Sequence, residues 1–192
     1  MYPLLGFSIL SLAIIIERGI MLSRARVPRT KLTEIVQALQ QNDISNAEAQ
    51  YQQLLGPVAS LGRLVLSLKD VPETEIEKRI SREGSRELKT LTRHLHLLEL
   101  IGKISPMVGL SGTVLGLAGT FQTVAGLQTM ADPSMLAGGI WEALITTVTG
   151  LFIAIPAIIF FHLYENRVKS ISFEMKNHTE TVVSVLKGKA EG

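Results

Sequence analysis

Residues 136–164 read LAGGIWEALITTVTGLFIAIPAIIFFHLY, and this stretch decides the fold. It is long enough to cross a bilayer as a helix, since about 20 apolar residues suffice. It carries one ionisable residue well inside, Glu142. A charge at bilayer depth costs about 2.5–3.5 kcal/mol on insertion scales, so such residues usually face the protein interior and mark an ion or substrate path. The stretch therefore predicts a membrane-spanning helix with a functional carboxyl group.

Small and hydroxyl side chains recur along this helix at helical spacing. A close-packing stripe at i, i+4, i+7, i+11 and i+14 consists of Ala143, Thr147, Gly150, Ala154 and Ala157. A polar stripe beside it consists of Glu142, Thr146 and Thr149. The remaining face, with Leu144, Ile155, Ile158 and Ile159, is expected to face lipid. Pro156 should kink the helix or free a backbone carbonyl for another partner.

A second uncharged stretch, residues 104–130, reads ISPMVGLSGTVLGLAGTFQTVAGLQTM and repeats this design. Its stripe of small and hydroxyl residues consists of Gly109, Thr113, Gly116, Thr120 and Thr123. Gly112 and Gly116 form a G-x-x-x-G pattern, which lets helix backbones approach closely. We therefore expect Gly109, Gly112, Gly116 and Gly150 to pack helices together. Two matching stripes favour a shared, pore-facing lining, although hydroxyls in membrane helices often bond only to the carbonyl four residues back.

Composition and charge indicate a membrane protein with a modest soluble part. The chain is 46% hydrophobic with a mean hydropathy of +0.30, and its lack of cysteine excludes disulfides and thiolate metal sites. All 19 Lys and Arg residues lie within residues 18–103 and 167–189. Positive residues beside spans mark the cytoplasmic side, which predicts a periplasmic N-terminus and a cytoplasmic C-terminus. The basic residues flank spans and alternate with acids, which disfavours nucleic-acid binding.

The rest of the chain completes a three-span, all-α membrane protein. We expect Arg18 to snorkel from the first span, and Asp43 or Ser45 to cap a cytoplasmic helix running toward Leu55. A longer helix opens at Pro72 and shows no stop before the second span. The predicted parts are a first span (1–22), a cytoplasmic helical domain (23–103), a second span (104–130), a periplasmic turn (131–135), a third span (136–164), and a cytoplasmic helix and tail (165–192).

Three stretches together resemble the ExbB/TolQ branch of the MotA/TolQ/ExbB proton-channel family. They are PLLGFSILSLAIIIER (3–18), ISPMVGLSGTVLGL (104–117) and GIWEALITTVTGLFIAIPA (139–157). The resemblance implies a homopentamer in the bacterial inner membrane that encloses the single spanning helices of an ExbD/TolR-like partner with a membrane aspartate. It also implies that ion flow drives a TonB- or TolA-like protein. By motif position, Thr113, Thr147 and Glu142 match the ion-pathway residues of the family, with Thr120, Thr123 and Thr146 as further candidate lining.

Several alternatives remain open from the residues alone. The extra hydroxyls of Thr146 and Thr149 could coordinate Na⁺, since hard cations take oxygen ligands. The chain could be a scaffold that only holds a partner's membrane helix, a motor subunit that energises gliding, or a subunit of a solute transporter, although it lacks the internal repeats expected of the last. Glu142 could be a neutral, hydrogen-bonded carboxyl between subunits. We find no nucleophile–base set, phosphate loop, cofactor motif or metal-ligand cluster, so we expect no enzyme, cofactor or metal.

Overall fold

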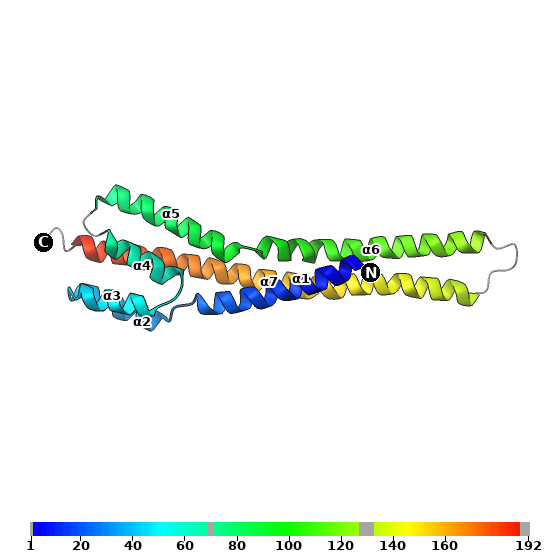
Figure 1. Ribbon diagram of the computed structural model, residues 1–192, viewed down its shortest axis with the longest axis horizontal. Helices are drawn as coiled ribbons and strands as arrows, with labels where there is room; N and C mark the ends of the chain where they lie inside the picture. The colour runs from blue at the N-terminus through cyan, green and yellow to red at the C-terminus, as the bar shows by residue number, and fades with distance from the viewer. Residues whose placement is uncertain (1, 69–70, 127–132, 189–192) are drawn as a thin grey trace. The chain divides into compact units, whose positions relative to one another are not determined.

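The computed structural model describes residues 2–68, 71–126 and 133–188, and every regular element within them is an α-helix. Three segments are long and apolar enough to cross a membrane, within Tyr2–Gln40, Thr74–Ala125 and Leu136–Gly188. The all-helical fold with three candidate spans is confirmed. In chain order the helices are α1 (Tyr2–Arg24), α2 (Arg29–Gln40), α3 (Ile44–Gln53), α4 (Pro57–Ser67), α5 (Glu73–Thr92), α6 (Leu95–Ala125) and α7 (Pro133–Gly188) (Figure 1).

Tertiary contacts divide the chain into two compact units. The membrane unit comprises Met1–Glu17 and His94–Leu163, and the helical-domain unit comprises Arg18–Arg93 and Tyr164–Gly192. Helix α7 runs without a break for 56 residues, from Pro133 to Gly188. It contributes to both units because the boundary between them falls at Leu163 and Tyr164. The helix also continues through Pro156, which cannot donate to the carbonyl one turn earlier.

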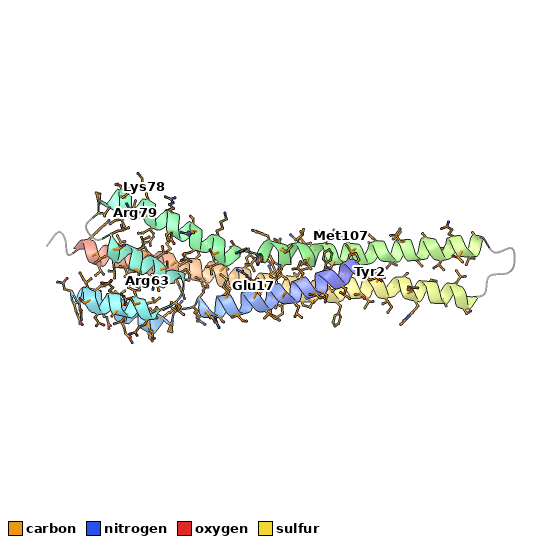
Figure 2. All side chains as sticks on the ribbon, viewed as in Figure 1. Tyr2, Glu17, Arg63, Lys78, Arg79 and Met107 are labelled. Carbon is orange, nitrogen blue, oxygen red and sulfur yellow. The ribbon has the colours of Figure 1, made fainter. Side chains whose placement is uncertain are left out.

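In the membrane unit, α6 and the first part of α7 run antiparallel and in close contact (Figure 1). Gly102, near the start of α6, lies against Ile158, whereas Gly116, further along, lies against Ala143. Large apolar side chains point outward from this pair, and Met107, which projects from α6 in Figure 2, is 66% exposed. Because no Lys or Arg occurs between residues 104 and 166, this outer surface suits lipid or other membrane helices.

The helical-domain unit has a core made by short helices and the last part of α7. Asp43 caps α3 as expected, since its side chain accepts a hydrogen bond from the Asn46 amide at 3.0 Å. The helix ends at Gln53, two residues before the predicted Leu55. Gly56 then adopts φ 109° ahead of Pro57, and a Cβ there would lie 2.7 Å from the Ala25 carbonyl oxygen. Glycine is therefore required at this turn.

The uninterrupted helix predicted from Pro72 into the second span is wrong. Helix α5 ends at Thr92 and α6 begins at Leu95, because Arg93 is extended and His94 lies in the left-handed region at φ 64°. His94 caps α6, and its Nδ1 lies 3.0 Å from the Glu17 carboxylate of α1. Histidine enters this backbone region more readily than most residues do, so no glycine or proline marks the break in the sequence.

The expected extension of Arg18 into the membrane interface is also wrong. Its side chain is only 3% exposed, and the guanidinium donates to the Thr90 carbonyl oxygen at 3.1 Å, which fastens α1 to the end of α5. A buried guanidinium needs such acceptors because burying an unpaired charge is costly. The predicted turn between the second and third spans lies mostly outside the described residues.

Candidate functional site

The candidate site is the contact between α6 and α7 in the membrane unit, where glycines let the two backbones meet. A Cβ added to Gly109 would lie 2.9 Å from the Thr146 carbonyl oxygen, and one added to Gly150 would lie 2.6 Å from the Ser105 carbonyl oxygen. A Cβ added to Gly112 would lie 2.8 Å from the Thr146 hydroxyl. Since both obstacles at the first two positions are backbone atoms, a larger residue there requires the helices to separate.

A cluster of oxygen atoms lies at the centre of this contact. The Thr113 hydroxyl meets the Thr147 hydroxyl across the helix pair and lies 3.0 Å from the Ala143 carbonyl oxygen. The Thr146 hydroxyl lies 2.7 Å from the same carbonyl and 3.2 Å from the Gly109 carbonyl oxygen. Three hydroxyls and two carbonyls from two helices are therefore gathered in one place. Each hydroxyl both donates and accepts, so the cluster can reorient hydrogen bonds without ionising.

Glu142 lies at the edge of this cluster on the exposed surface of α7. It immediately precedes Ala143, which is 2% exposed and supplies the carbonyl that two threonines share. In a single protomer the carboxyl group faces outward, beside the exposed Trp141. An ionisable side chain on an apolar outer surface needs a partner, because a bilayer provides none. Glu142 therefore lies on the outer surface of the α6–α7 pair, one residue from the buried Ala143.

The remaining predicted lining residues are arranged differently. Thr120 is half-buried, donates to the Gly116 carbonyl at 2.9 Å, and lies against Gly139 of α7. Thr123 is exposed and donates to the Gly119 carbonyl of its own helix at 2.9 Å. Thr149 similarly bonds within α7, to the Ile145 carbonyl. The structure thus brings Thr113, Thr146 and Thr147 together and leaves Thr123 apart from them.

Sequence reasoning missed Ser105 as part of the contact. Ser105 is fully buried, its hydroxyl donates to the Ile101 carbonyl at 2.7 Å, and its own carbonyl lies against Gly150. The signal was present, because Ser105 precedes Gly109 by four residues and so extends the same helical stripe toward the start of α6.

A second buried polar pair lies in the helical-domain unit. The Tyr51 hydroxyl of α3 lies 2.6 Å from Nε2 of His178 on α7, and the two rings meet edge to face. Burial lowers the pKa of His178 to about 4 and raises that of Tyr51. This neutral pair joins residues 127 positions apart and no sequence pattern indicated it. Among the described residues, no three His, Asp or Glu side chains are grouped to hold a metal ion.

Comparison with known proteins identifies the family of the chain, and the match covers parts of both units. Residues 47–177 match the family described as the MotA/TolQ/ExbB proton channel family. A Synechocystis protein named ExbB-like 3 is 35% identical over 166 residues, which cover 85% of this chain and 79% of the relative. The Tol-Pal system protein TolQ of Haemophilus influenzae is 31% identical over 202 residues, covering 98% of this chain and 88% of TolQ. The biopolymer transport protein ExbB of Xanthomonas campestris is 32% identical over 129 residues, covering 67% of this chain and 49% of the relative.

Proposed function

The chain belongs to the MotA/TolQ/ExbB proton channel family, in its ExbB/TolQ branch, and from this premise we propose that it is the ion-conducting subunit of an inner-membrane motor. The motor couples the proton motive force to work at the cell envelope by driving a TonB- or TolA-like protein. The chain acts as a transport component. The N-terminus lies in the periplasm and the C-terminus in the cytoplasm, in keeping with the positions of its Lys and Arg residues.

The hydroxyl cluster beside Glu142 carries the proposal. Thr113 and Thr147 come from different spans and meet through their hydroxyls, and Thr113 also donates to the carbonyl of Ala143, the residue that follows Glu142. Hydroxyl groups relay hydrogen bonds but cannot hold a transferred proton at neutral pH, so a proton path needs ionisable groups beside them. Glu142 supplies one such group from this chain.

We expect a second carboxylate from outside the chain. Residues 104–164 contain Asp132 and Glu142 as their only carboxylates, and Asp132 lies in the predicted periplasmic turn. Glu17, the carboxylate of the first predicted span, already pairs with His94. We therefore assign the second group to an aspartate in the spanning helix of an ExbD/TolR-like partner. A homopentamer that encloses this helix would also give Glu142 the protein environment that its exposed position in one protomer requires.

The test removes the ionisable group of Glu142 and the hydroxyls of the two threonines without changing side-chain volume much. Glu142→Gln, Thr113→Val and Thr147→Val should each reduce energised activity to the level of a deletion strain, measured as uptake through the outer membrane or resistance to detergent. The matched control is Ser111→Ala, since the Ser111 hydroxyl is exposed and bonds only to the Met107 carbonyl of its own helix. The oligomer should remain intact on gel filtration in all four variants. Full activity in the first three variants would reject ion conduction and leave the scaffold function.

Sodium coupling is the second candidate, because five oxygen atoms meet at the α6–α7 contact and hard cations take oxygen ligands. A sodium-driven motor should stop when Na⁺ is replaced by K⁺ while a protonophore leaves it running. A proton-driven motor should show the reverse. Thr146→Val, which removes one of the five oxygens, should impair only the sodium-driven form.

A further inference from the structure

Four cations form a continuous stripe along one side of α5. Arg79, Arg82, Arg86 and Lys89 are separated by three, four and three residues, which places them on one helical face. The stripe is about 15 Å long at the rise of an α-helix. Residues 78–93 contain six Lys or Arg and two Glu, so this part of the chain is strongly cationic.

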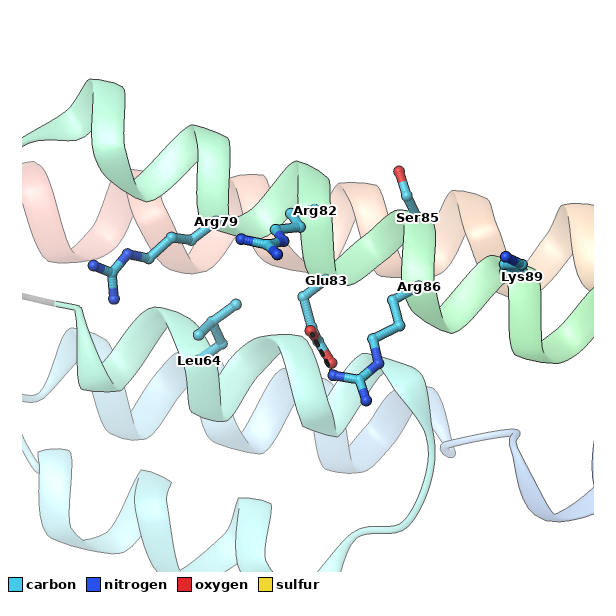
Figure 3. Close-up of a pocket in the computed structure, with 7 residues that line it drawn as sticks. All are labelled: Leu64, Arg79, Arg82, Glu83, Ser85, Arg86 and Lys89. Atoms are coloured by element: carbon cyan, nitrogen blue, oxygen red, sulfur yellow. Dashed lines mark ion pairs between the residues drawn. The ribbon is translucent and has the colours of Figure 1, made fainter.

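The stripe lies along a groove between α5 and α4 within the helical-domain unit. The groove has a volume of about 660 Å³, and Leu64 of α4 contributes an apolar side chain to a lining that is otherwise charged or polar. In Figure 3, Leu64 points from α4 toward α5, while Glu83 and Arg86 reach from α5 toward α4. The site is therefore a concave surface with a basic wall and an apolar contact point.

The acids of α5 neutralise only part of this charge. Arg79 is paired with Glu75 at 3.0 Å, and Arg86 lies 4.0 Å from Glu83, both in exposed pairs that contribute little stability. Arg82 and Lys89 are exposed and have no ion-pair partner among the residues that the structure describes. Two cations of the stripe are thus available to an incoming anion without breaking a contact.

From this groove we infer a docking site for an acidic peptide segment of a partner protein. An extended segment rises about 3.3 Å per residue, so about five residues match the length of the stripe. Glutamates or aspartates would pair with Arg82 and Lys89, and one apolar side chain would rest on Leu64. The inference goes beyond ion conduction and depends only on the groove and its charges.

An anionic bilayer surface and single-stranded nucleic acid fit the groove less well than an acidic peptide. A membrane-surface helix inserts its apolar face into the bilayer, but the apolar face of α5 is already used, since Ile76 and Leu91 are buried. A flat bilayer also reaches a concave floor poorly. Single-stranded nucleic acid is usually held by stacking on aromatic side chains, and the groove-lining residues include none.

The experiment uses the full chain in phosphatidylcholine nanodiscs and a fluorescein-labelled peptide of sequence serine–glutamate–glutamate–leucine–glutamate–glutamate–serine. Anisotropy should report binding that weakens as NaCl rises from about 0.05 M to about 0.5 M. Arg82→Gln combined with Lys89→Gln should raise the Kd about tenfold. The matched control, Arg26→Gln with Lys31→Gln, removes two exposed cations elsewhere in the same unit and should leave the Kd unchanged.

Equal loss in both double variants, or equal binding of a peptide with glutamine in place of glutamate, would overturn the inference. A fluorophore on Ser85→Cys distinguishes peptide binding from lipid binding in the groove. It can be attached at this single site because the chain has no other cysteine, and it reports on the groove because Ser85 lines it. An emission change on adding peptide in phosphatidylcholine supports docking. A change caused only by replacing phosphatidylcholine with phosphatidylglycerol would show that lipid headgroups occupy the stripe instead.

Discussion

At the residue scale, His178 gives the helical-domain unit a defined dependence on pH. Burial lowers its pKa from the ordinary 6.5 to about 4 in the folded chain. Between pH 6.5 and pH 4 the unfolded chain therefore binds a proton that the folded chain does not, and stability falls as the pH falls through this window. Below pH 4 both states are protonated and the contribution is constant. The full shift corresponds to a loss on the order of 3 kcal/mol.

Thermal unfolding of the purified protein between pH 7 and pH 4.5 checks this prediction. His178→Gln keeps a polar side chain opposite the Tyr51 hydroxyl but cannot titrate, so its Tm should fall less steeply with acid. His96→Gln is the control, because the side chain of His96 is 89% exposed. Parallel pH profiles for the wild type and His178→Gln would contradict the assignment.

Two glycines of the same unit should respond oppositely to alanine. A Cβ on Gly62 would lie 2.2 Å from the ring of the buried Tyr51, and overpacking of this kind typically costs about 1–3 kcal/mol. A Cβ on Gly84 would meet only the end of Leu61, at 4.0 Å. Gly84→Ala should therefore raise stability by about 0.5–1 kcal/mol through helix propensity, and Gly62→Ala should lower it. Denaturation of the two variants side by side measures both effects.

At the element scale, the α6–α7 pair depends on contacts between backbones. Gly150→Ala would place a methyl group 2.6 Å from the Ser105 carbonyl oxygen, so the helices must separate and the Thr113–Thr147 contact must weaken. We expect a loss of about 1–3 kcal/mol in the stability of the protein in detergent. Gly119→Ala is the control, because no atom lies within 4 Å of its added Cβ. A Gly150→Ala variant as stable as Gly119→Ala would show that the helices can separate without cost.

Periodicity in the sequence predicted the elements that repeat a pattern and missed those that depend on one contact. The stripes through Gly109 and Ala143 predicted two spans with small residues on one face, and Asp43 predicted the start of α3. The break at His94 and the buried Arg18 instead involve contacts with residues far away in the sequence, Glu17 and Thr90 respectively. Side-chain pairs so distant in the sequence leave no local spacing to detect.

The same limit applies to the candidate site. Threonine and glycine spacing indicates Thr113 and Thr147, which meet in the structure, because helical periodicity determines which residues share a face. It could not determine the rotation of one helix against the other. In the structure, Thr146 of α7 faces α6 and joins the cluster, whereas Thr123 of α6 bonds only within its own helix and is exposed.

At the scale of the whole molecule, the orientation in the membrane can be tested cleanly because the chain contains no cysteine. Tyr2 is 93% exposed at the start of α1, and Lys187 lies near the end of α7. Single cysteines at these positions, Tyr2→Cys and Lys187→Cys, can be labelled in intact spheroplasts with a maleimide that does not cross the membrane. The positive-inside rule predicts that only Tyr2→Cys is labelled.

Permeabilised cells provide the control, since both cysteines should then react. Labelling of Lys187→Cys in intact spheroplasts would place the C-terminus in the periplasm and overturn the proposed orientation. It would also move the cationic stripe of α5 to the periplasmic side. Two spans, the second and the third, lie between α5 and the C-terminus, so both are on the same side of the membrane. The acidic partner would then have to be a periplasmic protein, so this labelling experiment decides in which compartment that partner is sought.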